Sequence, residues 1–434
     1  MGKVKGKKIN VVTLGCSKNV VDSEHVMAQL AAAGYDVVFD SNGTEVRTVV
    51  VNTCGFIGDA KEESINTILG FVRAKEEGAI DRLFVIGCLS ERYAEELRRE
   101  IPEVDAYFGA RDFSGVVRAL TGSEGGAPAT ERMLTTPGHY AYLKISEGCN
   151  WRCAYCAIPL IRGPHVSVPE EQVLEEAGRL VRRGVKELIV VAQDTTYYGV
   201  DLYGERRLGR LLRRLAAIPG VEWVRLHYTY PTGFPDDVLA AMREEPKICR
   251  YIDIPLQHIA DRQLSAMRRG ITKRGTEELI ARLRREVPGI AIRTTLRVGF
   301  PGESEEAFAE LTEFVERQRV ERLGVFPYSA EEGTPSAEMA DDVPEEVKQA
   351  RVERIMELQR NISHEANVAR IGRKLRVVVD RREGDYYVAR SEYDSPEVDQ
   401  EILIPVAEGR LLPGEFRVVV VTACEEYDLY GRLA

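Results

Sequence analysis

Three closely spaced cysteines could hold a metal centre. Cys149, Cys153 and Cys156 stand in EGCNWRCAYCAIP and form a C-x3-C-x2-C motif, so one loop could wrap all three thiolates around a single centre. Structural zinc usually takes its four ligands from two separated pairs, and no second pair with that spacing lies nearby. A four-iron cluster has four corners, so three thiolates leave one iron open for a substrate or cofactor. The spacing therefore favours an iron-sulfur cluster, with zinc as the alternative.

A second set of three cysteines precedes this motif. Cys16 in LGCSKN, Cys54 in NTCGF and Cys88 in IGCLS each follow a short β-rich run. Ligands of open parallel sheets lie beyond the carboxyl ends of the strands, so these three loops are expected to converge. Many cysteines are only small buried side chains, but three at matching places indicate the thiolate ligands of a second cluster. Cys249 and Cys424 have no other cysteines at matching positions, and we interpret them as core or incidental residues.

An aromatic residue, Tyr155, stands directly before the third cysteine of the C-x3-C-x2-C motif. With this residue the motif resembles the signature of the radical S-adenosylmethionine (SAM) enzymes. The resemblance implies that the open iron binds SAM and that one electron from the cluster cleaves its sulfonium to give a radical. VVAQDTTYYG, residues 190–199, occupies the place of the family's motif for the methionyl amino group, which adds Gln193 and Asp194 to Tyr155 as expected cofactor-binding residues.

A glycine- and proline-containing run, VGFPGES at residues 298–304, ends a later strand candidate. Glycine permits a close approach of backbone to a flat cofactor, so this run is a second candidate for the SAM pocket. The alternative is that either run is an ordinary turn between a strand and a helix.

Three parts together make the chain similar to the methylthiotransferases over nearly its whole length: an N-terminal three-cysteine domain, a radical barrel and a small β domain of the TRAM type. The resemblance implies two 4Fe-4S clusters and SAM as cofactors, with no catalytic residue beyond the cluster ligands. One branch of the family modifies tRNA adenosine, and another modifies the β-carbon of an aspartate in ribosomal small-subunit protein twelve. A C–H bond without acidity cannot be opened by a general base near neutral pH, so radical chemistry suits either target.

The choice of branch rests on several short motifs. LGCSKNVVDSE, AQDTTYYG, HYTYP, ARSEYDSPEVD and YDLYG resemble the ribosomal-protein branch. From Val368 onward the chain has 10 Lys and Arg against 13 Asp and Glu, and an acidic face suits a basic protein loop better than RNA. The expected partners are protein twelve, alone or within the small subunit, and a reductant protein such as flavodoxin or ferredoxin; tRNA is not expected. The alternatives are a tRNA adenosine methylthiotransferase and a noncatalytic iron-sulfur or RNA-binding scaffold.

The elements that position the cysteines follow from alternating β-rich and helical runs, which predict an α/β fold. Three such alternations over residues 9–100 are typical of a doubly wound parallel α/β domain. Six further strands over residues 142–326 predict a partial (β/α)6 barrel, and the β-rich runs over 375–433 predict a small all-β barrel or sandwich. The resemblance implies that the first is a radical-SAM barrel and the second a TRAM-like barrel. The expected domains are the methylthiotransferase domain at 8–121, a linker at 122–138, the radical SAM core at 139–366 and the TRAM-like β domain at 367–434.

Composition narrows the class of protein. The 434 residues carry a net charge of −10 and are 44% hydrophobic, which is typical of a globular chain with several domains. No run approaches the ~18 apolar residues needed to cross a bilayer, and the basic start MGKVKGKKIN has no apolar segment of a secretion signal. We therefore expect a cytoplasmic protein without a membrane partner.

Three further features have no assigned catalytic role. His258 in PLQH follows a strand on the expected active face, and a structural role is at least as well supported as a pocket role. Arg297 in TLRVGFPGE could contact the cofactor or a nearby carboxylate. Asp22, Ser23 and Glu24 are expected to cap a helix and to place acidic groups in its first turn, which would stabilise it by about 1 kcal/mol.

Overall fold

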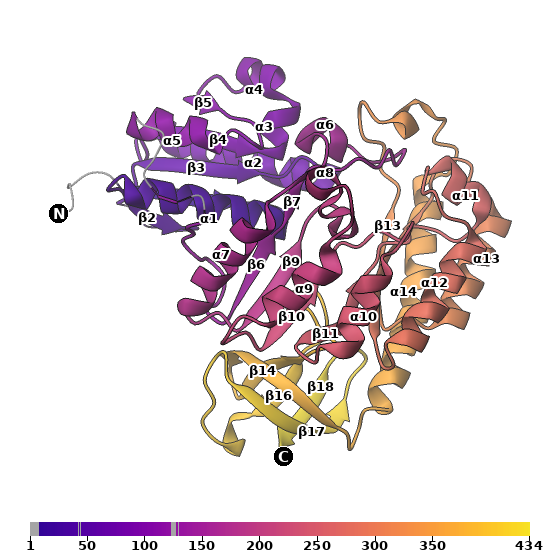
Figure 1. Ribbon diagram of the computed structural model, residues 1–434. Helices are drawn as coiled ribbons and strands as arrows, with labels where there is room; N and C mark the ends of the chain where they lie inside the picture. Colours follow the sequence, from indigo (N-terminus) through magenta and orange to yellow (C-terminus); the bar gives the residue numbers. More distant parts are fainter. Residues whose placement is uncertain (1–7, 42, 44, 123–126, 129) are drawn as a thin grey trace. The chain divides into compact units, whose positions relative to one another are not determined.

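The computed structural model describes residues 8–41, 43, 45–122, 127–128 and 130–434 (Figure 1). The basic start, residues 1–7, and positions 123–126 and 129 of the expected linker lie outside the described residues. The chain divides into two compact units. Unit 1 comprises Met1–Thr136, Tyr142–Trp151 and Cys156–Arg179, and unit 2 comprises Pro137–Ala141, Arg152–Tyr155 and Leu180–Ala434.

Unit 1 contains a five-stranded parallel sheet with the strand order β2-β1-β3-β4-β5. Its inner strands are runs of β-branched residues buried on both faces, because separate apolar clusters pack on the two sides of the sheet. This confirms the doubly wound α/β domain, and β2 and β5 are strands that the sequence pattern did not predict. The elements are β1 (Lys8–Thr13), α1 (Ser17–Ala32), β2 (Asp36–Phe39), β3 (Thr48–Thr53), α2 (Gly58–Glu76), β4 (Arg82–Gly87), α3 (Cys88–Arg92), α4 (Ala94–Glu100), β5 (Ala106–Tyr107) and α5 (Phe113–Thr121).

The start of α1 differs from the sequence prediction. The helix begins at Ser17 with Cys16 at its N-cap position, so Asp22, Ser23 and Glu24 lie in its second turn. All three side chains are buried, and both carboxylates pair with buried cations instead of capping the helix. The predicted cap is therefore wrong, because tertiary ion pairs account for these acidic residues.

The rest of unit 1 is formed by residues that follow the expected linker in the sequence. The short strands β7 (Ser146–Glu147) and β8 (Val166–Ser167) pair antiparallel, with α6 (Ile158–Arg162) between them and α7 (Glu170–Arg182) after them. Arg132, inside the expected linker, is a fully buried side chain that pairs with Glu24 of α1 and Glu176 of α7. This part of the predicted linker is therefore an integral part of the core of unit 1.

Unit 2 is built on a six-stranded sheet with the order β13-β12-β11-β10-β9-β6, to which β6 contributes its first residues (Figure 1). Its strands run parallel and are separated by helices, as in α9, where Leu208, Leu211, Leu212 and Leu215 form one buried stripe. The partial barrel fold is confirmed. The elements are β6 (Tyr140–Lys144), β9 (Glu187–Val191), α8 (Val200–Tyr203), α9 (Leu208–Ala216), β10 (Trp223–Leu226), α10 (Asp236–Glu244), β11 (Ile248–Asp253), α11 (Asp261–Ala266), α12 (Lys273–Glu286), β12 (Ala291–Val298), α13 (Glu305–Gln318), β13 (Arg322–Pro327) and α14 (Glu345–Val368).

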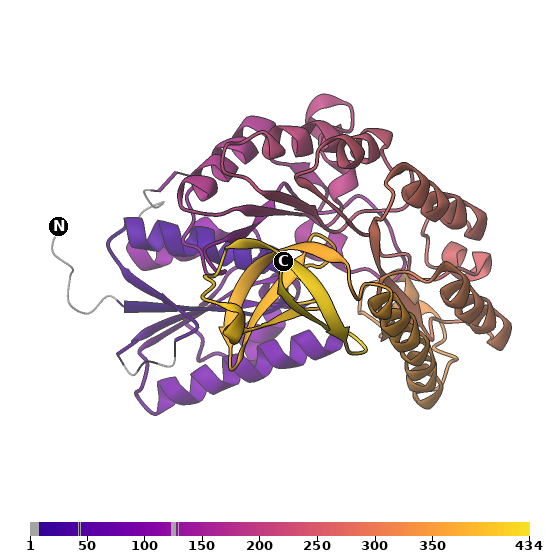
Figure 2. The same ribbon diagram turned by 90° about the horizontal axis from the view of Figure 1, so that it is seen from below.

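The C-terminal part of unit 2 is a closed five-stranded barrel, seen in yellow in Figure 2. Alternate residues of its strands, among them Val377, Val379 and Tyr387, point into one apolar core. Closure leaves no sheet edge unpaired, and it decides between the barrel and the sandwich in favour of the barrel. The strands are β14 (Lys374–Glu383), β15 (Tyr386–Ser391), β16 (Ile402–Pro405), β17 (Phe416–Cys424) and β18 (Leu429–Leu433).

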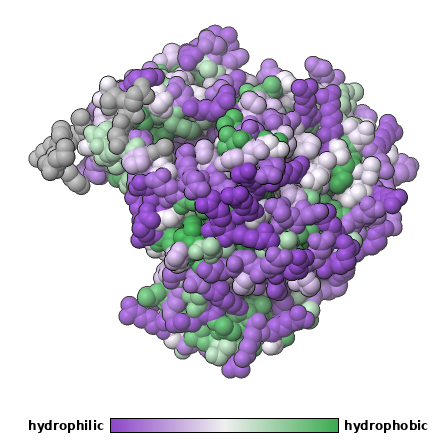
Figure 3. Space-filling model, viewed as in Figure 1, coloured by the Kyte–Doolittle hydropathy of each residue, from purple (hydrophilic) through white to green (hydrophobic). Residues whose placement is uncertain are grey.

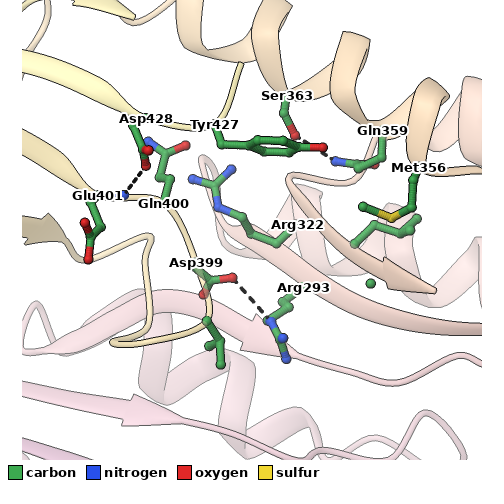
Figure 4. A pocket seen from close by; sticks show the side chains of 13 residues that line it. Arg293, Arg322, Met356, Gln359, Ser363, Asp399, Gln400, Glu401, Tyr427 and Asp428 are labelled. Carbon is green, nitrogen blue, oxygen red and sulfur yellow. Dashed lines mark hydrogen bonds and ion pairs between the residues drawn. The ribbon is translucent and has the colours of Figure 1, made fainter. Parts of the chain in front are cut away.

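The loop between β15 and β16 joins this barrel to the six-stranded sheet. Asp394 pairs with Arg322 at 2.5 Å, and Asp399 pairs with Arg293 at 3.3 Å. Figure 4 shows the second pair beside a cavity of about 440 Å³ that also lies against α14. Both arginines are in the amino-terminal halves of their strands, so the loop covers the edge of the sheet opposite to the expected active face.

The visible face of the molecule is mainly hydrophilic, with small scattered hydrophobic patches (Figure 3). Within the described part of the chain, no helix is both long and apolar enough to span a membrane.

Candidate functional site

Unit 1 brings Cys16, Cys54 and Cys88 together; we call these three residues the auxiliary set. Cys16 occupies the N-cap position of α1 after β1, Cys54 follows β3, and Cys88 begins α3 after β4. Burial raises the pKa of Cys54, and the Cys16 thiol raises it further. Burial also raises the pKa of Cys88 to about 12, and both other thiols add to that rise. The backbone agrees with this, because Gly15, beside Cys16, packs against Cys54, and Gly55, beside Cys54, packs against Cys88.

Each auxiliary cysteine has a glycine neighbour that allows the loops to approach one another. A Cβ atom on Gly15 would lie 2.7 Å from Cys54 Cβ, and one on Gly55 would lie 2.7 Å from the Leu89 backbone. A Cβ on Gly87 would lie 2.5 Å from the Thr53 carbonyl oxygen. Contacts this short exclude any side chain, so the glycines are needed for the convergence of the three thiols.

Replacing Gly55 by alanine is expected to separate the loop after β3 from α3. The added methyl group has only rigid backbone beside it, and overpacking of this kind costs about 1–3 kcal/mol of unfolding free energy. The variant should unfold at lower temperature, as measured by calorimetry, and an iron centre on the auxiliary set would be lost with the displaced loop, as measured by iron analysis. Gly70→Ala in α2 is the matched control, because a Cβ there meets nothing within 4 Å. Equal iron content in the two variants would contradict the expectation.

The donor set of this site suits an iron-sulfur cluster. Three thiols without a histidine are soft ligands, which select iron-sulfur clusters, zinc or monovalent copper over hard cations. Among the described residues, no three His, Cys, Asp or Glu side chains lie close enough to hold a single metal ion. The chemistry of the donors therefore fits an iron-sulfur cluster, with zinc as the alternative.

A buried arginine contacts the auxiliary set. Arg162 at the end of α6 donates from Nε and Nη2 to Cys88 Sγ, at 3.3 and 3.2 Å. Its Nη2 also donates to Asn19 Oδ1 at 2.6 Å, and its Nη1 donates to Asp22 Oδ2 at 2.8 Å. The guanidinium opposes the burial effect and lowers the pKa of Cys88, so it stabilises the thiolate form that binds metal.

Further charges complete this network. Lys144 pairs with Asp22 and lies 2.7 Å from Glu147 Oε2, which in turn accepts from Arg162 Nη1 at 3.2 Å. The nearby carboxylates raise the pKa of Lys144 and that of Arg162 against the opposing effect of burial. Both cations therefore stay charged inside unit 1, where an unpaired charge would be very costly.

The loop with Cys149, Cys153 and Cys156, which we call the radical set, contributes residues to both units. Cys149 and Cys156 belong to unit 1 together with the auxiliary set, whereas Cys153 belongs to unit 2. The Cys149 amide donates to the Gly163 carbonyl at 3.1 Å, and a Cβ on Gly148 would lie 2.1 Å from the Pro164 oxygen. The start of the loop is thus held tightly by the turn after α6.

Polar side chains of unit 2 surround Cys153. Arg269 Nη1 lies 3.4 Å from Cys153 Sγ, and the Tyr230 hydroxyl lies 3.5 Å from the same sulfur. Arg269 is buried, its Nη2 donates to the Pro255 carbonyl at 2.5 Å, and its guanidinium lies 4.3 Å from the Tyr230 ring centroid. A thiolate at Cys153 therefore has a fixed cation and a hydroxyl beside it.

Tyr155 is held by neighbours on the carboxyl-terminal side of the sheet. Its hydroxyl accepts from Arg269 Nη1 at 3.2 Å, and its ring meets Phe300 edge-on at 6.5 Å between centroids. Arg297 lies 4.7 Å from the centre of the same ring and 3.4 Å from Gln257 Oε1. The contact of Arg297 is therefore with an aromatic ring and an amide; its role toward a cofactor stays a prediction.

The two predicted SAM motifs follow β9 and β12. Gln193 and Asp194 come directly after β9, and Asp194 Oδ1 accepts from the backbone and the hydroxyl of Thr196 at 2.8 and 2.6 Å. At Gly299 a Cβ would lie 2.2 Å from Lys348 Cγ, so a side chain of α14 occupies the space where a cofactor was expected to approach. The binding roles of Gln193 and Asp194 remain predictions.

His258 is a fully buried residue with structural contacts. Its Nδ1 accepts from the Ala260 amide at 3.0 Å, and its Nε2 lies 3.5 Å from Glu303 Oε2. Glu303 also accepts from the Gly299 amide at 2.8 Å and pairs with Arg351 at 2.9 Å. These contacts favour the structural interpretation of His258.

Sequence reasoning missed the groups that surround the sulfur atoms. Arg162, Arg269 and Tyr230 each contact a cysteine of one of the two sets. Tyr230 lies in HYTYP, one of the runs that resemble the ribosomal-protein branch. The two arginines are far in the sequence from the cysteines that they contact, so no motif indicated that they would contact a sulfur atom. Tyr228 and Gln257, with φ of 55° and 73°, mark strained backbone after β10 and β11 at this same edge.

Known protein families and curated relatives match nearly the whole chain. The Radical SAM superfamily matches residues 143–315, the uncharacterized protein family UPF0004 matches residues 8–109, and the TRAM domain matches residues 371–434. The ribosomal protein uS12 methylthiotransferase RimO of Bacteroides thetaiotaomicron is 53% identical over 431 residues, which cover 99% of both chains. The chain belongs to the RimO family. A RimO of Porphyromonas gingivalis is 54% identical over 98% of this chain and 99% of its own.

As a member of the RimO family, the chain is a radical SAM methylthiotransferase that uses SAM and iron-sulfur chemistry. Solved structures support the fold. The radical SAM methyltransferase TsrM of Kitasatospora setae aligns with a TM-score of 0.56 at 14% identity over 76% of this chain and 74% of its own. The cobalamin-dependent enzyme OxsB aligns with a TM-score of 0.51 at 12% identity, over 81% of this chain and 56% of its own. At such low identity these likenesses concern the fold alone.

Proposed function

We propose that the chain adds a methylthio group to the β-carbon of an aspartate in ribosomal protein uS12 and that it uses two 4Fe-4S clusters. The radical set would hold the first cluster and the auxiliary set the second. The observation that carries the proposal is the close packing of the three loops that hold Cys16, Cys54 and Cys88 in unit 1, the unit that also contains Cys149 and Cys156. The cofactors supply the radical that opens an unactivated C–H bond and the site from which sulfur is delivered.

The residues of the chain have binding and orienting roles in this proposal. Arg269 and the Tyr230 hydroxyl lie beside Cys153 and would stabilise its thiolate. Tyr155, Gln193 and Asp194, at the carboxyl-terminal side of the sheet, would line the SAM pocket. Active sites of such barrels lie at this face, and the loop between β15 and β16 covers the opposite one.

The substrate assignment rests on the relatives and on charge. The RimO relatives are named for uS12, and the C-terminal barrel is acidic, as expected for contact with a basic protein. A reductant protein such as flavodoxin or ferredoxin would supply electrons, and the reaction would take place in the cytoplasm. The domain limits proposed from the sequence, 8–121, 122–138, 139–366 and 367–434, place one cysteine set in each of the first and third segments.

The test is anaerobic reconstitution followed by iron and sulfide analysis and by reaction with SAM, a reductant and either uS12 or tRNA. We expect about eight irons per chain, the count for two four-iron clusters, and a methylthio mass gain on the uS12 aspartate by mass spectrometry. A mass gain on tRNA alone would overturn the substrate assignment. About four irons without SAM cleavage would leave only an iron-sulfur scaffold.

Replacing Cys54 by alanine tests the role of the auxiliary cluster independently of the SAM-cleaving cluster. The variant should still cleave SAM, because the radical set is intact, but it should form no methylthio product. Measuring 5′-deoxyadenosine and modified uS12 in the same reaction checks both statements. Product formation by the Cys54 variant would show that the auxiliary set is not the site of sulfur delivery.

A further inference from the structure

Arg162 contacts a sulfur atom of the auxiliary set in a geometry that the proposed reaction leaves unexplained. Two of its N–H groups, on Nε and Nη2, point at the one sulfur of Cys88, at 3.3 and 3.2 Å. The side chain is only 2% exposed. A planar guanidinium offers its donors in a rigid fork, so this contact is directional and not merely a charge nearby.

The guanidinium is fixed in this orientation from the side of α1. Asn19 Oδ1 accepts from Nη2 at 2.6 Å, and Asp22 Oδ2 accepts from Nη1 at 2.8 Å. Both partners lie on the helix that begins after Cys16. Arg162 therefore connects the loop of Cys88 with the helix whose N-cap position Cys16 occupies.

The same side chain also belongs to the loop of the radical set. Arg162 ends α6, the helix that follows Cys156. Its Nη1 donates at 3.2 Å to Glu147, two residues before Cys149. The sulfur and the carboxylates bind different nitrogen atoms of the guanidinium. The carboxylates of Asp22 and Glu147 accept from Nη1, whereas the sulfur of Cys88 accepts from Nε and Nη2. The sulfur of Cys88 therefore faces the Nε and Nη2 edge of the guanidinium, which no carboxylate of the described residues contacts, although the carboxylates on Nη1 neutralise the charge of Arg162.

We propose that Arg162 is a positioning residue that raises the reduction potential of the auxiliary cluster through its two hydrogen bonds to Cys88. This inference rests on the proposed function, which places a cluster on the auxiliary set. Reduction adds a negative charge to a cluster, and donors to its sulfur atoms stabilise that reduced state. Burial strengthens the effect, because little water screens the guanidinium.

The experiment isolates the auxiliary cluster in the full chain. Changing Cys149, Cys153 and Cys156 to alanine leaves only the auxiliary set, and an EPR-monitored redox titration then measures one midpoint potential. In this background Arg162→Gln should lower the midpoint potential, because the charge and the fork are lost. Arg162→Lys should recover part of the shift, because the charge remains without the fork.

Two further variants distinguish an electrostatic effect on the midpoint potential from an effect of lost stability. Arg132→Gln is the matched control, since Arg132 is equally buried and paired with Glu24 and Glu176 in the same unit. It should lose stability but keep the wild-type potential. Asp22→Asn combined with Arg162→Gln removes one charge of each sign, so it should fold better and show a smaller fall in potential, which reports the loss of the two hydrogen bonds alone.

The outcomes distinguish this inference from the function on which it rests. Absence of iron from the triple-alanine background would overturn the two-cluster proposal and the inference with it. A bound cluster whose potential is the same in Arg162→Gln and Arg132→Gln would overturn the role of Arg162 alone. A fall in potential confined to the Arg162 variants, including the double variant, would establish it.

Discussion

Replacement of Cys153 by alanine is expected to abolish SAM cleavage. The change removes one of the three thiolates of the radical set, together with the sulfur beside which Arg269 and Tyr230 lie. Even the loss of an outer-shell partner costs about 10–100-fold in metal affinity or activity, so the loss of a ligand should exceed about 100-fold. The measurement is 5′-deoxyadenosine formation under anaerobic conditions, with iron counted in the same sample.

The matched control for this prediction is Cys424→Ala. Cys424 is a half-buried thiol at the end of β17 that belongs to neither cysteine set. Its replacement removes the same sulfur atom from the chain and should leave SAM cleavage and iron content unchanged. Substantial cleavage by the Cys153 variant would show that the C-x3-C-x2-C motif is not the SAM-cleaving site.

The second large effect concerns stability. Glu187 at the start of β9 is fully buried between Arg225 of β10, at 2.8 Å, and Arg390 of the C-terminal barrel. Both arginines hold the pKa of Glu187 below its usual range despite burial. Glu187→Ala leaves the buried Arg225 without a carboxylate and leaves Arg390 with Asp380 alone, which should lower the free energy of unfolding by about 3–5 kcal/mol.

An exposed ion pair at the same junction provides the control. Glu222 pairs with Arg376 of β14 at 2.6 Å, with both side chains more than 40% exposed. Glu222→Ala should cost at most about 1 kcal/mol, because water screens exposed pairs. Urea unfolding can be followed by Trp223, which is buried against Phe416 at this junction, in a Trp151→Phe background. Equal losses in the two variants would contradict the assigned importance of Glu187.

The difference between expectation and structure at α1 has a physical cause. The sequence pattern suggested a helix that starts near residue 23, with its acidic residues at the first turn. The helix starts at Ser17, and Glu24 instead meets Arg132, more than one hundred residues away in the chain. Helix caps are local and can be predicted from neighbours, whereas such a pair depends on the packing of distant segments.

Local residue patterns were enough to predict the α/β class, the partial barrel, the C-terminal β domain and the two cysteine sets, because strand and helix periodicity and ligand spacing are short-range properties of a chain. The side chains that touch the sulfur atoms, in contrast, could be identified only from the folded chain. Arg162 reaches Cys88 and Arg269 reaches Cys153 across 74 and 116 residues of sequence. Contacts of this kind arise when separate elements pack together, and no local pattern specifies which buried cation will meet which thiol.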